Sequence, residues 1–197
     1  ERMAEAAKLK PKDAEIRTQL GVVCIAKGQL DRAVGHLQKA IEIAPDNSEA
    51  YFNLGVAMYR RGDKAKAAEN WRQSLQLKPN DYEAHYNLAL VLGEQGQTDQ
   101  AIEHYRRTVE LKPDHTLAHG GLGVALCVKG AFQEGVEHLT KAVEFDPDNT
   151  TIRFNLAITL ARLKQHEQAI AHLVQILRRE PTNADAILCI AVSYAET

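Results

Sequence analysis

The sequence has little of several features that mark particular classes of protein. No stretch approaches the roughly 18 consecutive apolar residues of a membrane span, so we expect no direct membrane insertion. Only three cysteines occur, far apart and odd in number, which argues against a disulfide framework and favours a reducing, cytoplasmic compartment. The formal net charge is -2 and no basic cluster stands out, so we expect no nucleic-acid partner.

The motifs of catalysis and of metal binding are also missing. There is no nucleophile motif, no glycine-rich phosphate loop and no Cys-x-x-Cys pair, so we expect no catalytic residues, no cofactor and no enzyme in this chain. His115 and His119 have i, i+4 spacing but no evident third ligand. We therefore expect no metal site. Four further histidines recur every 34 residues or multiples of it and are interpreted as semi-buried packing residues: His36, His104, His138 and His172.

A strict internal repeat dominates what the sequence does contain. Its only six prolines fall at intervals of 34 residues: Pro11, Pro45, Pro79, Pro113, Pro147 and Pro181. Setting each proline at position 32 of a unit gives five complete repeats, residues 14–47, 48–81, 82–115, 116–149 and 150–183. Residues 1–13 then supply the second helix of a partial repeat, and residues 184–197 the first helix of another. We predict a single array over residues 1–197.

Each unit has the pattern of two helices. Positions 7 and 11 are apolar in every complete unit, which predicts a buried face on a first helix. Position 15 is glycine in four of the five units, and we expect it to end that helix in a left-handed conformation. Positions 20 and 24 lie on one face of a second helix. Small residues at positions 8 and 20 let the two helices approach closely, so each unit is predicted to be a helical hairpin.

One hairpin cannot cover its own apolar face, so like hairpins are expected to stack. The second unit has Leu54 and Gly55, followed by Ala67, Trp71 and Pro79, and this pattern resembles the tetratricopeptide repeat (TPR) family. The resemblance covers essentially the whole chain at a constant period. It implies an all-α fold, an α-α superhelix or TPR solenoid of stacked antiparallel helical hairpins.

The fifth unit departs from the pattern. Lys164 stands where the other units have glycine, so either Lys164 is left-handed at a cost of about 1 kcal/mol or the turn closes differently. We expect this turn to be less regular than the others. The half-unit after it is too apolar for a capping helix, so either more chain follows or this end packs on another copy.

The free face of the first helices is the predicted functional surface, which in the TPR family lines the concave side of the array. Apolar side chains that a fold does not need are typical of protein-binding surfaces. The candidate residues are aromatic, aliphatic or amide side chains and one glycine: Phe52, Asn53, Val56, Tyr59, Tyr86, Asn87, Leu90, Gly121, Phe154, Asn155 and Ile158.

Part of this surface has two interpretations. The carboxamides of Asn53, Asn87 and Asn155 bond either the main chain of an extended ligand or a neighbouring helix. Gly120 and Gly121 are either a notch for a ligand side chain or a site of close helix packing.

A carboxylate clamp, by which co-chaperone TPR domains hold a chaperone C-terminus, is missing here. Glu15, Glu49 and Glu83 stand on the candidate face, where they would repel a carboxylate and favour a ligand with basic residues.

Two functions fit these observations. The first is a protein–protein interaction scaffold that binds a peptide or helix of a partner in its concave groove. The alternative is a substrate-presenting or regulatory TPR arm of a larger enzyme, such as a glycosyltransferase, because such enzymes have similar arrays.

A second resemblance concerns the later repeats. The segments 130–135, 152–156 and 190–194 are similar to the magnetosome-associated TPR scaffold family of magnetotactic bacteria. It implies a homo-oligomer that assembles through the terminal half-repeats and the concave face into a coat. The resemblance also implies a peripheral location on an organelle membrane.

Overall fold

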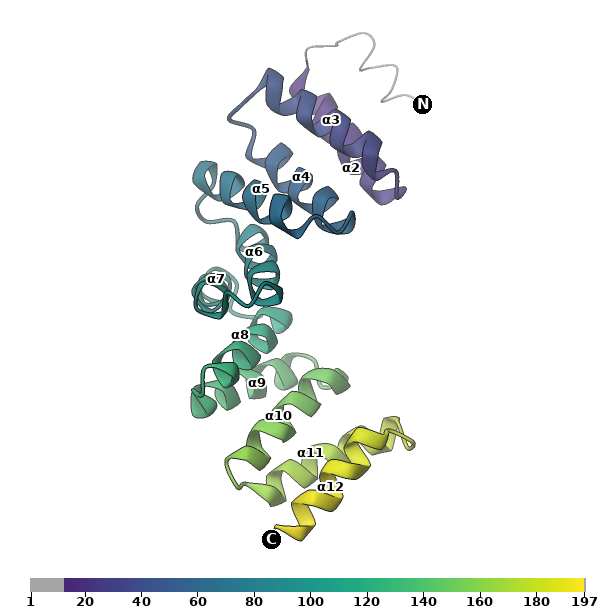
Figure 1. The fold of residues 1–197 in the computed structure, drawn as a ribbon, viewed down its shortest axis with the longest axis vertical. Helices are drawn as coiled ribbons and strands as arrows, with labels where there is room; N and C mark the ends of the chain where they lie inside the picture. The colour runs from purple at the N-terminus through teal and green to yellow at the C-terminus, as the bar shows by residue number, and fades with distance from the viewer. Residues whose placement is uncertain (1–12, 197) are drawn as a thin grey trace. The chain divides into compact units, whose positions relative to one another are not determined.

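The structure, a computed structural model, describes residues 13–196, and these form helices and no strand (Figure 1). Within these residues no helix combines the length and the apolar character that crossing a membrane requires. The helices are α2 (Ala14–Ala26), α3 (Leu30–Ile43), α4 (Ser48–Arg60), α5 (Lys64–Leu77), α6 (Tyr82–Glu94), α7 (Thr98–Leu111), α8 (Thr116–Val128), α9 (Phe132–Phe145), α10 (Thr150–Arg162), α11 (His166–Arg179) and α12 (Ala184–Ala195).

The chain divides into two compact units, residues 1–95 and 96–197. In the first unit, each helix from α2 to α5 packs on the next one, and α2 also contacts α4. In the second unit, α7 to α12 pack in the same sequential way, and α8 and α12 both contact α10. The predicted all-α fold of stacked TPR hairpins is therefore present in each unit. The helix predicted for residues 1–13 lies outside the described residues apart from Asp13, which caps α2.

Each first helix among the described residues begins at a side-chain cap. The capping residue stands at position 34, and its side chain accepts a hydrogen bond from a backbone N–H of the first turn, as Asn47 Oδ1 does from Ala50 N at 2.9 Å. Such a bond satisfies one of the four backbone donors that a helix start leaves unpaired. The six caps are Asp13, Asn47, Asp81, His115, Asn149 and Asn183.

The predicted buried face of the first helices is confirmed. All the residues at positions 7 and 11 are buried, from Leu20 to Leu160. Trp71, on α5, is the largest fully buried side chain, and its Nε1 donates to the main-chain oxygen of Phe52 at 3.2 Å. A Cβ atom added at Gly55 would lie 2.6 Å from Trp71 Nε1. The small residue at position 8 therefore makes room for the large one at position 24.

The turn inside each hairpin is left-handed, as predicted. Position 15 has φ between 70° and 86° in the four glycines, and Lys164 adopts the same conformation with φ 60°. The expectation of an irregular turn at Lys164 is wrong. Lys164 N donates to Ala161 O at 2.9 Å and Gln165 N to Leu160 O at 2.9 Å, and the turn at Gly130 makes the same two bonds. These two hydrogen bonds keep the backbone of the turn in the same conformation, and Lys164 is therefore held at a positive φ that is unfavourable for a residue with a Cβ atom.

Replacing Lys164 by glycine is therefore expected to raise the free energy of unfolding by about 0.5–1 kcal/mol. The change removes about 1–2 kcal/mol of left-handed strain and adds about 0.5–1 kcal/mol of chain entropy lost on folding. Urea denaturation followed by circular dichroism measures the difference. The reciprocal variant, Gly130→Lys, should be destabilised, and a Lys164→Gly variant less stable than the wild type would contradict the account.

Candidate functional site

In the first unit, the candidate surface is formed by α4 and α6. Every candidate side chain here is partly exposed, so the fold does not seal the surface. Helix α4 supplies Phe52, Asn53, Val56 and Tyr59, and α6 supplies Tyr86, Asn87 and Leu90. Val56 and Leu90 occupy the same repeat position, so this part of the surface presents like residues on successive first helices.

Tyr59 ties the two helices of this surface together. Its hydroxyl donates to Glu94 Oε1 at 2.8 Å, and Glu94 Oε2 lies 3.2 Å from Lys64 Nζ. The Tyr59 ring centroid is 5.9 Å from that of Trp71 at an interplanar angle of 45°. Burial, and then the Glu94 carboxylate, raise the pKa of Tyr59, so the phenol stays a neutral donor. The hydrogen bond to Glu94 and the ring contact with Trp71 together fix the orientation of the Tyr59 side chain.

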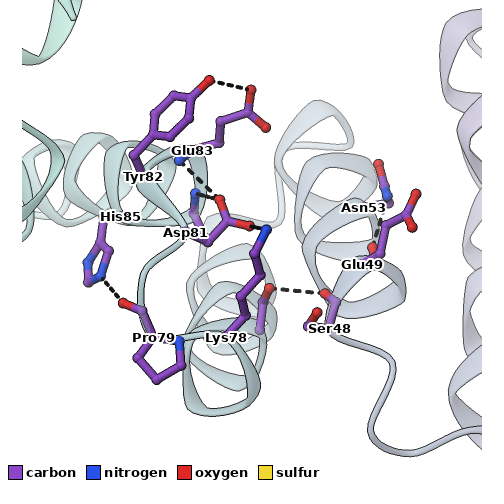
Figure 2. Close-up of polar contacts among 11 residues, drawn as sticks. Ser48, Glu49, Asn53, Lys78, Pro79, Asp81, Tyr82, Glu83 and His85 are labelled. Carbon is purple, nitrogen blue, oxygen red and sulfur yellow. Dashed lines mark hydrogen bonds and ion pairs between the residues drawn. The ribbon is translucent and has the colours of Figure 1, made fainter. Parts of the chain in front are cut away.

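The three asparagines are not equivalent. Asn53 Nδ2 donates to the main-chain oxygen of Glu49, one turn earlier on the same helix, at 2.8 Å (Figure 2). Within the described residues, the carboxamides of Asn87 and Asn155 have no hydrogen-bond partner. Both donor and acceptor groups of these two amides are therefore available to a ligand.

Acidic side chains border the surface of the first unit. Glu49 Oε1 accepts from Gln19 Nε2 at 3.3 Å. Glu83 Oε1 accepts from the Tyr82 hydroxyl at 3.3 Å, as Figure 2 shows. Both carboxylates are exposed, and neither forms a salt bridge among the described residues. Glu15 is exposed as well. Exposed carboxylates without a salt bridge attract cationic groups of a ligand.

In the second unit, the predicted residues lie on two helices. Phe154, Asn155 and Ile158 are partly exposed on α10, and Phe154 also packs against a buried cluster that includes Leu173. Gly121 lies on α8, where an added Cβ would be 2.5 Å from Tyr105 Cζ. The Tyr105 ring of α7 thus occupies the space beside this glycine, which serves close helix packing.

Further exposed apolar residues of this unit were not among the candidate residues, although Val124 shares its repeat position with Val56, Leu90 and Ile158. Leu117, Val124 and Val128 are 52%, 38% and 70% exposed, and their spacing of seven and four places them on one face of α8. We call these three residues the α8 stripe. Leu188 and Val192 of α12 are exposed too. The sequence held the signal, because positions 2 and 13 are apolar in the fourth repeat and mostly polar in the others.

Three of the four recurring histidines pack between the helices of one hairpin. His36 Nδ1 lies 3.5 Å from Arg17 Nη1, His172 Nδ1 lies 3.3 Å from Arg153 Nη1, and His138 contacts His119. Among the residues that the structure describes, no group of three or more His, Cys, Asp or Glu side chains is arranged to hold a metal ion.

The hairpins and the partly exposed apolar faces of their first helices define a helical-repeat protein. Family models for this architecture match most of the chain between residues 21 and 188. One, described as TPR repeat, matches residues 21–62, and three described as tetratricopeptide repeat match residues 48–81, 86–150 and 129–188. The chain belongs to the tetratricopeptide repeat superfamily.

Solved structures share this fold. YrrB, described as a TPR protein with an unusual peptide-binding site, is 22% identical with a TM-score of 0.86, over 95% of this chain and 96% of that chain. MamA (41-end) from Desulfovibrio magneticus RS-1 is 23% identical with a TM-score of 0.79, over 87% and 97%. PilF of Pseudomonas aeruginosa is 19% identical with a TM-score of 0.77, over 93% and 85%. No curated protein sequence matches the chain.

Proposed function

We propose that this chain is a protein-interaction scaffold that binds a peptide or helical segment of a partner on the first helices of its hairpins. The observation behind the proposal is the α8 stripe, whose side chains are exposed although the helix itself is packed on three others. Exposed apolar side chains in a row are typical of interaction surfaces. The peptide-binding site that the YrrB description names supports the same function.

In the proposed complex, apolar contacts supply the affinity, and amide and carboxylate groups supply the selectivity. Apolar burial supplies the affinity, at about 25 cal/mol per Å² of apolar surface, from the α8 stripe and from Phe154 and Ile158. In the first unit, Phe52, Val56, Tyr86 and Leu90 have the same role. The carboxamides of Asn87 and Asn155 bond the main chain of an extended segment, since each offers a donor and an acceptor. Glu49 and Glu83 favour a segment with basic residues.

A selection from a phage library of short random peptides, panned on the immobilised chain, tests this function. We expect the retained peptides to combine apolar with basic residues. Replacing Val124 by aspartate should weaken the peptides that bind the second unit about tenfold or more, which is roughly 1.4 kcal/mol, because the apolar contact is exchanged for a charge.

The control is a second Asp substitution away from the candidate surface. Leu77 is as exposed as Val124 but lies at the end of a second helix, so Leu77→Asp should leave peptide affinity unchanged. Equal losses in the two variants would place binding elsewhere, and a library that yields no peptide would contradict the proposal.

Three finer expectations stay predictions. Self-assembly into a coat and a peripheral place on an organelle membrane come from the magnetosome-associated resemblance, and the MamA structures support only the shared fold. The exposed Leu188 and Val192 of α12 favour self-association. The role of an enzyme arm is the alternative, although TPR repeats generally serve as interaction modules.

A further inference from the structure

Two histidine rings meet between α8 and α9 in the second unit. His119 Nδ1 lies 2.9 Å from His138 Nδ1, and the rings stack with centroids 5.1 Å apart at an interplanar angle of 30°. The other nitrogen of His119, Nε2, lies 3.0 Å from the main-chain oxygen of Pro113. His119 is only 4% exposed, and the Phe145 ring centroid lies 5.7 Å from its own. A buried imidazole is thus held at both nitrogens.

These contacts limit how many protons the pair can hold. A carbonyl oxygen only accepts, so His119 Nε2 carries a proton. In the neutral pair, His119 Nδ1 is bare and accepts from the Nδ1–H of His138. A third proton still leaves one N–H between the two Nδ1 atoms. A fourth proton gives both Nδ1 atoms a hydrogen, so the bond between the rings is lost and two donors face each other.

The corresponding pairs of the first and fifth repeats contain only one titratable ring. His119 and His138 stand at positions 4 and 23 of their repeat, where the fifth repeat has Arg153 and His172. Arg153 Nη2 donates to Pro147 O at 2.7 Å and Nη1 lies 3.3 Å from His172 Nδ1. The third repeat has histidines at both positions, His85 and His104, and His85 Nε2 bonds Pro79 O in the same way (Figure 2). In the fourth and fifth repeats, the position-4 side chain therefore links the turn before the first helix to the second helix.

The charged groups around the pair come from three elements. In addition to burial, Lys141 of α9 lowers the pKa of both rings, because its positive charge disfavours protonation of either one. Glu134 and Glu137 of α9 act in the opposite direction on the pKa of His138. Glu134 is partly neutralised by Arg106 of α7, at 2.7 Å. On α10, Arg153 is directed to its own partners. His115, which caps α8, uses its Nδ1 to accept from Ala118 N.

Burial is the largest cause that lowers the pKa of both His119 and His138. Below the ordinary histidine pKa of 6.5, the unfolded chain therefore binds more protons than the folded hairpin. The contribution of this pair to stability is therefore fully present above pH 6.5 and falls as the pH drops below that value.

We propose that the His119–His138 pair is an acid-sensitive latch that holds the first turn of α8 against α9 and releases it when both rings are protonated. The released turn begins with the capping residue His115 and includes Leu117, the first residue of the α8 stripe. Acid therefore moves Leu117 relative to the rest of the α8 stripe. Its effect on partner binding rests on the proposed function. The latch itself requires no ligand.

Ring ¹⁵N spectra of the full chain test the geometry without any variant. At neutral pH, we expect the proton of His119 on Nε2 and that of His138 on Nδ1. A His138 ring protonated on Nε2, or two rings that titrate independently near pH 6.5, would overturn the proposal.

Amide hydrogen exchange tests the release. As the pH is lowered from neutral through the histidine range, the protection of α8 and α9 amides should fall. If about two protons are taken up on opening, the equilibrium constant for opening rises about a hundredfold per pH unit. His119→Arg copies the arrangement of the fifth repeat and should reduce the uptake to about one proton. An unchanged pH dependence in His119→Arg would refute the latch. Neither measurement involves a peptide, so a failed selection and a failed latch are distinguishable.

Discussion

Replacement of Trp71 by alanine is expected to lower the free energy of unfolding of the first unit by about 3–5 kcal/mol. Trp71 is 2% exposed and lies directly against Gly55, so truncation leaves a cavity between α4 and α5. Residue 55 of the neighbouring helix α4 is glycine, so it has no side chain that could fill this cavity. The change also removes the hydrogen bond that Trp71 Nε1 donates to the main-chain oxygen of Phe52. This loss is small, because Phe52 lies inside α4, where a main-chain oxygen is also an acceptor for the helix. Loss of packing is therefore the larger part.

Amide exchange of α4 and α5, with urea denaturation, measures this loss within the first unit. Leu77→Ala is the control, because Leu77 is on the same helix but 42% exposed, and its truncation should cost less than about 1 kcal/mol. Equal losses for the two variants would show that Trp71 does not organise this hairpin.

The second large effect is expected at Gly123, where adding one methyl group should destabilise the second unit by about 1–3 kcal/mol. A Cβ atom at this position would lie 2.6 Å from Leu139 Cγ and 2.9 Å from the main-chain oxygen of Gly135. Leu139 can rotate, but the backbone oxygen moves only if α8 and α9 separate. Helix propensity alone predicts the opposite sign, since alanine is favoured over glycine by about 1 kcal/mol. The steric clash outweighs this gain in helix propensity.

Gly35→Ala is the matched control for this prediction. Gly35 is also inside a helix, α3, but it is exposed and an added Cβ meets nothing within 4 Å. There helix propensity acts alone, and the variant should gain up to about 1 kcal/mol. The comparison uses thermal and urea denaturation of both variants. A stabilised Gly123→Ala variant would contradict the close packing of α8 on α9.

The sequence predicted which face of the first helices stays partly exposed, and its role as a binding site stays a prediction. The repeat position of each residue identified the face of the first helices, because like positions recur on successive hairpins. The contacts of individual residues were not predictable in the same way. Asn53 bonds its own helix, and Tyr105 occupies the space beside Gly121. Both contacts depend on rotamers and on neighbouring helices, which a repeat pattern does not specify.

The sequence by itself determined the helices, their turns and the buried face, because these follow from local rules: apolar spacing, a left-handed residue at position 15 and a cap at position 34. Lys164 shows how strongly the pattern acts, since its turn makes the same hydrogen bonds without glycine. Only the tertiary structure decided which polar groups meet. His119 and His138 are 19 residues apart on different helices, and a distance of 2.9 Å between their Nδ1 atoms exists only once α8 packs on α9.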